Sequence, residues 1–292
     1  MDNHIIQINN LVKIYGKKQV LKDLSLSIPM GSVYGLLGKN GEGKTTLIKC
    51  LLGLLRPSAG SVRTLCDDPW NFRDQTKAQL SYVPQSDRLY PWLTVRQIID
   101  YTASFYRHWN KDLIDRLVKE WRIDWEDKVG LLSEGQAQKV SILLSLGHEP
   151  QLLVFDEPVA SLDPQARREF LKTILEIVSG RECTVFFSTH ITSDLERVAD
   201  HVAILNNGGI AFDGELDMLK EGFKRLRILA QHPLPADFSF NGCLRCETSD
   251  NGAIVTVNNY SSQLKEDLEK KYEAKVQIED LNLEEIFLEL TQ

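Results

Sequence analysis

The sequence has few cysteines, no long apolar run and no excess of basic residues. Its five cysteines are odd in number and mostly far apart, so we expect no disulfide framework and a reducing compartment. Cys243 and Cys246 form a lone CxxC, but no second pair or nearby His completes a zinc site, so we expect neither a metal nor a redox role for them. No apolar stretch reaches the roughly 18 to 20 residues of a membrane helix, and the first residues do not resemble a secretion signal. We therefore expect a cytoplasmic protein.

Composition and charge narrow the class further. Hydrophobic residues make up 42% and charged residues 26% of the 292 residues, the balance of an ordinary globular protein with room for one large and one small domain. The formal net charge of −7 argues against a broad nucleic-acid surface, so we expect no nucleic acid as a partner.

The order of predicted elements indicates an α/β domain over residues 1–219, with a helical subdomain inserted at about 86–147. The ranges read as strands are 5–8, 24–28, 33–37, 152–155, 184–188 and 202–205, and those read as helices are 44–54, 94–105, 111–121 and 135–146. Residues 56–60 (RPSAG) are interpreted as a break. Residues 220–292 read as a small α+β accessory domain, with a hairpin turn at 250–252.

A phosphate-binding motif follows the strand at 33–37 directly. The segment GKNGEGKTT, residues 38–46, matches GxxxxGK[ST] between a strand and a helix. Its glycines let successive backbone N–H groups face phosphates, and the start of the helix adds its positive end. The residues expected to hold a nucleotide here are Gly38, Asn40, Gly41, Gly43, Lys44, Thr45 and Thr46. Among them, Lys44 would reach the phosphates and the Thr45 hydroxyl would bind Mg²⁺.

A second acidic motif, LLVFDEP, places Asp156 and Glu157 at the end of a hydrophobic strand. Next to the phosphate motif, the first carboxylate would orient a metal and the second would accept a proton from attacking water. Gln85 follows another strand and offers an amide to Mg²⁺, which gives Thr45, Gln85 and Asp156 as the expected metal residues. His190 comes just after the strand at 184–188, at the end of the segment TVFFSTH, where it could contact the γ-phosphate. Tyr15 could stack on an adenine ring.

The segment LSEGQ, residues 132–136, has two interpretations. Ser133 and Gln136 form a capping box, which opens many ordinary helices. The same helix start, with Ser133, Gly135 and Gln136, is also a ready anion site.

With these motifs the sequence resembles the ATP-binding subunits of ABC transporters over about residues 4–217. The resemblance identifies Tyr15 as the adenine-stacking aromatic, residues 38–46 as the P-loop, Gln85 as the Q-loop residue and LSEGQ as the signature. It further implies Glu157 and His190 as catalytic residues and SLD, with Asp163, as the D-loop. The implied fold is a P-loop NTPase of the ABC ATPase type, and the implied cofactors are ATP and Mg²⁺.

The resemblance also implies partners. Two subunits pair head to tail, so that the signature of one closes on the ATP of the other; we expect a homodimer, with a heterodimer as the alternative. A separate multi-span permease would dock on the helical insert near residues 85–106 and hold the protein on the inner face of the membrane. The ending LNLEEIFLELT is similar to that of bacterial drug and antibiotic-peptide exporters. This similarity favours export of a drug, peptide or lipid-like compound. The alternatives are import and a non-transport process on nucleic acid or ribosomes. Glu134 stands where the usual signature has glycine, and we expect it to tune closure of the pair.

Overall fold

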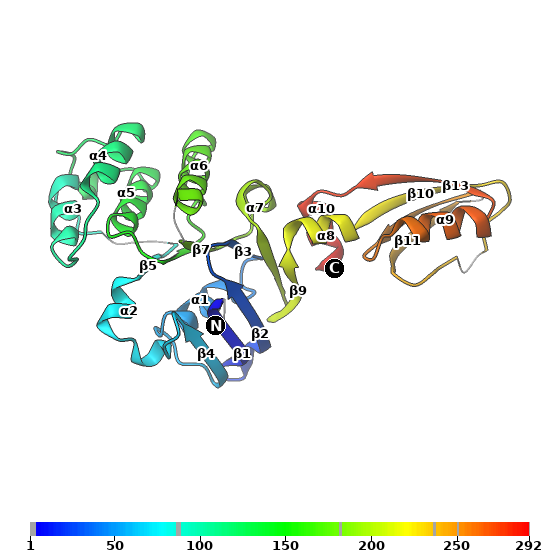
Figure 1. Cartoon of the computed structure of the whole chain (residues 1–292), viewed down its shortest axis with the longest axis horizontal. Coiled ribbons are helices and arrows are strands. Elements are labelled where there is room, and N and C mark those ends of the chain that lie inside the picture. Colours follow the sequence, from blue (N-terminus) through cyan, green and yellow to red (C-terminus); the bar gives the residue numbers. More distant parts are fainter. Residues whose placement is uncertain (1–3, 86–88, 181–182, 236–237, 250, 292) are drawn as a thin grey trace. The chain divides into compact units, whose positions relative to one another are not determined.

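The chain forms two compact units, Met1–Asp213 and Gly214–Gln292. The computed structural model, drawn in Figure 1, describes residues 4–85, 89–180, 183–235, 238–249 and 251–291. The boundary expected after residue 219 falls inside helix α8, Leu216–Gly222.

The first unit is built on a six-stranded sheet with the order β5-β6-β7-β3-β8-β9. Neighbours among β5, β6, β7, β3 and β8 run parallel. The strands are β3 Val33–Gly38, β5 Leu80–Val83, β6 Leu152–Asp156, β7 Thr184–Thr189, β8 His201–Asn206 and β9 Gly209–Glu215. Every residue of β3, β6 and β7 is buried. The unbroken apolar runs in the sequence predicted this, because they are typical of strands in a sheet that is covered on both faces.

A second, antiparallel sheet has the order β2-β1-β4. Its strands are β1 His4–Tyr15, β2 Lys18–Pro29 and β4 Ala59–Thr64. The break expected at 56–60 is therefore too long, because β4 begins at Ala59, which pairs with Val12 of β1. Gly60 has φ +83°, and a Cβ there would lie 2.3 Å from the Asn10 carbonyl oxygen. The glycine that looked like part of a turn therefore allows β4 to lie close to β1.

Helix α1, Lys44–Leu51, is held by the core between the two sheets. Its Leu47, Ile48 and Leu51 are fully buried in one cluster with side chains of both sheets. The sheet members of that cluster include Ile6, Ile8, Leu24, Leu26, Tyr34, Leu36, Val154 and Phe186. This packing fixes the start of α1 at the end of β3, where the phosphate motif lies.

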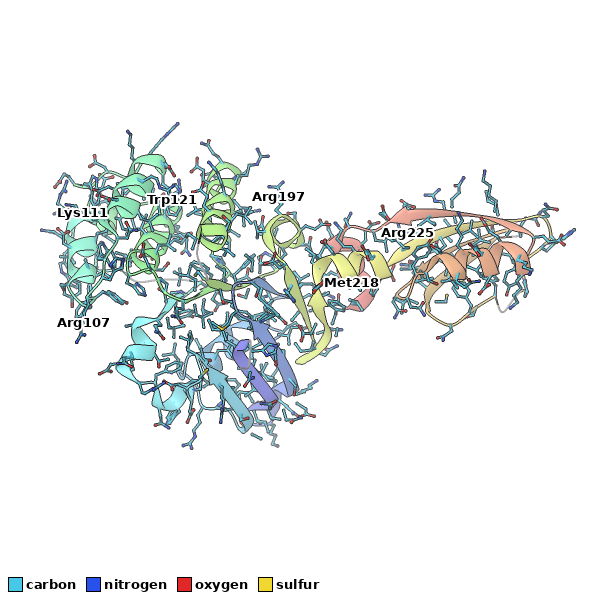
Figure 2. The ribbon with its side chains drawn as sticks, in the orientation of Figure 1. Arg107, Lys111, Trp121, Arg197, Met218 and Arg225 are labelled. Carbon is cyan, nitrogen blue, oxygen red and sulfur yellow. The ribbon has the colours of Figure 1, made fainter. Side chains whose placement is uncertain are left out.

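The insert is helical, as expected. Between residues 89 and 147 the structure has α3 Val95–Ala103, α4 Lys111–Glu120 and α5 Glu134–Leu146, with a single isolated bridge between Thr94 and Lys128. Trp121, at the end of α4, is buried in this bundle (Figure 2). The remaining helices of the unit are α2 Asp74–Ala78, α6 Pro164–Gly180 and α7 Thr192–Val198. Among the residues placed by the structure, no helix is both long and apolar enough to cross a membrane.

The second unit is an antiparallel sheet with the order β11-β12-β10-β13, packed against α9. Its elements are β10 Lys224–Ala230, β11 Cys243–Ser249, β12 Gly252–Val257, α9 Ser262–Lys271, β13 Ala274–Asp280 and α10 Leu283–Leu290. Its core contains Leu226, Ile228, Val255 and Leu268. The hairpin predicted around residues 250–252 joins β11 and β12, although Asp250 lies outside the described residues.

Candidate nucleotide-binding site

The residues of the phosphate motif line one cavity of about 460 Å³, a volume within the range of small-ligand sites. The lining comprises Val20, Asn40, Gly41, Gly43, Lys44, Thr45, Thr46, Gln85 and Glu157. Eight of these nine residues were predicted from the sequence. Val20, on β2, was not predicted. No local motif shows that an apolar residue of the antiparallel sheet will line a cavity next to the parallel sheet.

The loop before α1 has glycine at two positions whose left-handed backbone would strain any other residue. Gly43, the N-cap of α1, has φ +111°, and a Cβ would lie 2.9 Å from a methyl of Leu21 and 3.1 Å from one of Val20. Gly41 has φ +85°. No side chain caps α1 and its first turn has no acidic residue, so its N–H groups are left for an anion in the cavity.

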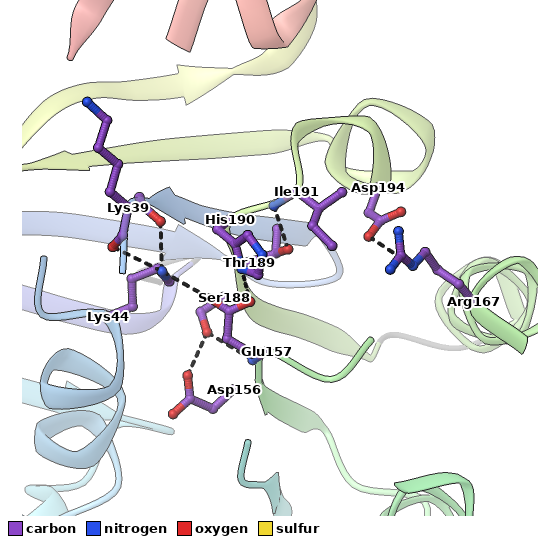
Figure 3. Close-up of polar contacts among 11 residues, drawn as sticks. Lys39, Lys44, Asp156, Glu157, Arg167, Ser188, Thr189, His190, Ile191 and Asp194 are labelled. Carbon is purple, nitrogen blue, oxygen red and sulfur yellow. Dashed lines mark hydrogen bonds and ion pairs between the residues drawn. The ribbon is translucent and has the colours of Figure 1, made fainter. Parts of the chain in front are cut away.

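Lys44, Glu157 and His190 form a connected polar chain at the cavity (Figure 3). The Lys44 ammonium lies 2.9 Å from Glu157 Oε1 and donates to the Gly38 carbonyl at 2.7 Å. Glu157 Oε2 lies 2.8 Å from His190 Nδ1. Lys44 and Glu157 are 6% and 5% exposed, whereas the His190 side chain is 43% exposed. The buried charges therefore balance each other, and the histidine connects them to the surface.

Glu157 is held in an unusual backbone conformation. Its φ of +52° is in the left-handed region, which is uncommon for residues with a side chain. Its N–H donates to the Ser188 carbonyl at 3.1 Å and to Ser188 Oγ at 3.2 Å, which anchors it to β7. Strained residues of this kind concentrate at functional sites, where the surroundings enforce the geometry.

Asp156 has the arrangement expected of a metal-facing carboxylate. It is 1% exposed; its Oδ1 accepts a hydrogen bond from Ser188 Oγ at 2.7 Å, and its Oδ2 is buried without a hydrogen-bond partner. A bare buried carboxylate oxygen is costly unless a cation or water meets it. Within the described part of the chain no three His, Cys, Asp or Glu residues cluster as a metal site.

The signature segment lies outside the cavity and caps α5. Ser133 Oγ accepts from the Gln136 N–H at 3.3 Å, and Gln136 Oε1 accepts from the Ser133 N–H at 3.0 Å, so the predicted capping box is present. Glu134 is exposed in the first turn. A Cβ on Gly135 would lie 3.3 Å from the Ser161 carbonyl, so this helix start packs against the segment that contains the predicted D-loop.

Two other predicted residues, Asp163 and Tyr15, are not among the residues that line the cavity. Asp163 Oδ1 accepts from the N–H groups of Gln165 and Ala166 at 2.9 and 3.0 Å and starts α6; the Ala166 bond is the main cause that lowers the pKa of Asp163. Tyr15 ends β1 with its ring 48% exposed and the Lys13 ammonium 5.1 Å from its centroid.

One contact near the site has no sequence signal. Arg167, on α6, lies 3.8 Å from Asp194 of α7, a carboxylate that is only 2% exposed (Figure 3). Burial raises the pKa of Asp194, against the opposing effects of Arg167, Arg197 and His190. The pair thus joins the helix that follows the D-loop to the helix that follows His190.

Comparison with known proteins gives consistent matches. The family model described as ABC transporter matches residues 21–160. The bacitracin transport ATP-binding protein BcrA of Bacillus licheniformis is 32% identical over 219 residues, covering 74% of this chain and 72% of that protein. The Nod factor export ATP-binding protein I of Burkholderia orbicola is 35% identical over 212 residues, covering 70% and 68%.

Two solved structures resemble the fold. An ATP-binding subunit of an ABC transporter is 29% identical with a TM-score of 0.67, covering 74% of this chain and 92% of that one. A dimeric bacterial ABC transporter cassette has a TM-score of 0.64 and covers 72% and 98%; at 22% identity it shows the fold alone.

Proposed function

The chain belongs to the ABC transporter family as an ATP-binding, ATP-hydrolysing subunit, and from this premise we propose how its residues perform the reaction. The observation that carries the proposal is the polar chain in which buried Lys44 and Glu157 line the cavity and the partly exposed His190 contacts Glu157. The P-loop amides and Lys44 bind the phosphates of ATP. Lys44 exchanges its partner, from the Glu157 carboxylate to the phosphates, and Glu157 becomes free to accept a proton from the attacking water.

His190 and Glu157 act together in this scheme. The imidazole contacts Glu157 Oε2, and its remaining, partly exposed edge would contact an incoming γ-phosphate. Gln85, at the cavity wall, places its amide beside the attacking water. Tyr15, with an exposed ring at the end of β1, stacks on the adenine.

The residues present fit Mg²⁺. Asp156, with one buried oxygen lacking a partner, Thr45 and Gln85 would hold the ion together with the nucleotide phosphates. When bound, Mg²⁺ neutralises phosphate charge and raises the electrophilicity of the γ-phosphorus.

Subunits of this family dimerise and work with a membrane permease. For this chain we propose a homodimer, in which Ser133, Gly135 and Gln136 of one copy close on the γ-phosphate held by the other. The position of Gly135 against the Ser161 carbonyl supports this, because it couples the signature to the D-loop at the same face. ATP then joins the two copies and hydrolysis releases them.

An exposed aromatic cluster on the insert is the proposed permease contact. Tyr90, Trp92, Tyr101 and Phe105 are 45%, 68%, 46% and 68% exposed, and neighbouring rings lie 5.0 to 5.8 Å apart. Exposed aromatic side chains that gather in one patch are typical anchors of protein interfaces. Docking here would place the protein on the inner face of the membrane through its permease.

Export is the proposed direction. BcrA is named for bacitracin transport and the Nod factor protein for export, and both are similar to this chain over about 70% of its length. By analogy, a drug, peptide or lipid-like compound would be the cargo.

The test is to purify a Glu157→Gln protein from detergent-solubilised native membranes with Mg-ATP, beside a Lys44→Ala control that lacks the phosphate-binding cation. We expect a stoichiometric multi-span protein with Glu157→Gln and a much weaker yield with the control. Ribosomes or nucleic acid in place of a membrane protein would overturn the transport role.

A further inference from the structure

The edge strand β11 contains a β-bulge between the two cysteines of the CxxC segment. In its antiparallel pairing with β12, Cys243 lies opposite Val257, Arg245 opposite Thr256, and Cys246 opposite Val255. Leu244 is the extra residue, and its side chain is 43% exposed. Residues three apart in a regular strand face opposite sides of a sheet, but the extra residue brings Cys243 and Cys246 to the same side.

That shared side is the core side of the sheet. Val255 and Val257, opposite the two cysteines, are fully buried, and both thiols pack on the same hydrophobic cluster. Burial raises the pKa of Cys246, and the nearby Cys243 side chain adds to the rise. The Cys243 thiol donates to the Arg245 carbonyl at 3.7 Å. Both residues remain partly exposed, so small reagents reach them.

The backbone before the bulge is firmly placed. Gly242 has φ +89°, a Cβ there would overlap the Asn259 side chain, and its carbonyl accepts from the Asn258 N–H at 3.2 Å. The Cys243 N–H donates to the Phe240 carbonyl at 3.1 Å. These contacts at the start of β11 therefore set which side of the sheet Cys243 faces, and the pairing of β11 beyond the bulge sets the side that Cys246 faces.

We propose that Cys243 and Cys246 form a reversible oxidation site, closing an intrastrand disulfide when the protein meets a hydroperoxide. In the first step the thiolate of Cys243 attacks the peroxide oxygen, because the raised pKa of Cys246 disfavours the thiolate there; the O–O bond breaks, a sulfenic acid forms and the leaving oxygen departs as water after protonation. In the second step the other sulfur attacks the sulfenic sulfur, and the hydroxyl leaves as water. Two thiols and one hydrogen peroxide thus give one disulfide and two water molecules.

The sheet geometry indicates that this bond is easily reduced. The two cysteines lie opposite positions two residues apart on β12, a spacing of about 6.6 to 6.8 Å along a strand. This is the upper end of the Cα separations that a disulfide spans, and strained disulfides are the reducible ones. The bulge therefore makes a bond that forms under oxidation and opens again with ordinary thiols.

The test is to treat the full chain with hydrogen peroxide, denature it, alkylate free thiols and map the peptides by mass spectrometry. We expect the peptide with both cysteines to lose two hydrogens and to escape alkylation, while Cys50 and Cys183 are alkylated. Dithiothreitol added before denaturation should restore both thiols. Alkylation of Cys243 and Cys246 at peroxide doses that oxidise the exposed Cys66 would overturn the proposal, as would their pairing between two chains.

A matched variant separates the bulge geometry from the mere presence of two thiols. Cys246→Ser combined with Glu247→Cys keeps two cysteines in β11, but residue 247 lies opposite Ile254 on the other side of the sheet. We expect no intrastrand disulfide in this variant and at least tenfold weaker retention on immobilised phenylarsine oxide, a probe that needs two adjacent thiols. Equal retention and equal oxidation in the two proteins would refute the shared facing.

Discussion

The Lys44–Glu157 ion pair makes a quantitative prediction about ATP binding. The two groups lie 2.9 Å apart and are almost fully buried, so at an effective dielectric constant of about 20 their attraction is about 6 kcal/mol before desolvation. Removing one partner of such a pair leaves the other charge uncompensated and typically costs about 3 to 5 kcal/mol. In Glu157→Gln, the Lys44 ammonium keeps the Gly38 and Lys39 carbonyls but loses its anion.

A nucleotide replaces that missing anion. We therefore expect Glu157→Gln to destabilise the protein without nucleotide and to bind a non-hydrolysable ATP analogue about 10- to 100-fold more tightly than the unaltered protein. This gain in affinity is smaller than the full free-energy cost of the broken ion pair, because the Lys44 ammonium still donates hydrogen bonds to the two carbonyls. Hydrolysis of ATP itself should fall by about two to four orders of magnitude, the scale of a lost general base.

Calorimetric titration with the analogue and thermal unfolding with and without it measure both effects. Glu149→Gln is the matched control, since that carboxylate pairs with His108 at 2.7 Å outside the cavity. An affinity for the analogue that is equal to or weaker than that of the unaltered protein would show that Lys44 does not exchange partners. Undiminished ATP hydrolysis would separately refute Glu157 as the base.

Three further variants test other parts of the structure. Glu134→Gly should lower, by about fivefold, the ATP concentration needed for half-maximal pairing, because it removes a repulsion of about 1 kcal/mol near the partner's phosphate; an unchanged midpoint in light scattering contradicts this. Trp92→Ala should reduce recovery of the permease at least tenfold and spare ATP hydrolysis by the isolated protein. Trp70 is 52% exposed against 68% for Trp92 and serves as the control: Trp70→Ala should leave recovery of the permease unchanged, and equal losses would disprove the contact. Burial lowers the pKa of His148 to about 4. Below about pH 6.5 the unfolded chain therefore binds a proton at His148 that the folded protein does not bind until the pH falls to about 4. Stability should therefore fall by about 3 kcal/mol between pH 6.5 and 4 and level off below, and His148→Phe should flatten this slope in urea unfolding.

Short-range features of the site were predictable from the sequence because neighbouring residues determine them. A strand followed by glycines and a helix leaves the phosphate loop little alternative, and Gly43 has the positive φ that only glycine adopts easily. The capping box of Ser133 and Gln136 likewise depends on four consecutive positions. Both predictions concern contacts within a few residues of chain.

The features that sequence reasoning missed depend on distant partners. The carbonyl and hydroxyl of Ser188 anchor Glu157 across two strands, and nothing in a chain separation of 31 residues marks that contact. Strand β4 was hidden because its first residues, Ala59 and Gly60, are typical of turns, and only the pairing with β1 makes them a strand. The bulge at Leu244 was missed for the same reason, because a register shift is defined only by the pairing of two strands.

The two interpretations of the signature segment would describe the same atoms before and after the proposed second copy binds. The box satisfies the N–H groups of Ser133 and Gln136, and leaves those of Glu134 and Gly135 in the first turn for a ligand. A phosphate from a partner copy would meet these two amides and the Ser133 hydroxyl at the positive end of α5. The cap would therefore fix the helix start before a second copy binds, so ordering this segment on pairing would cost little free energy, and the exposed Glu134 carboxylate would repel an anion there.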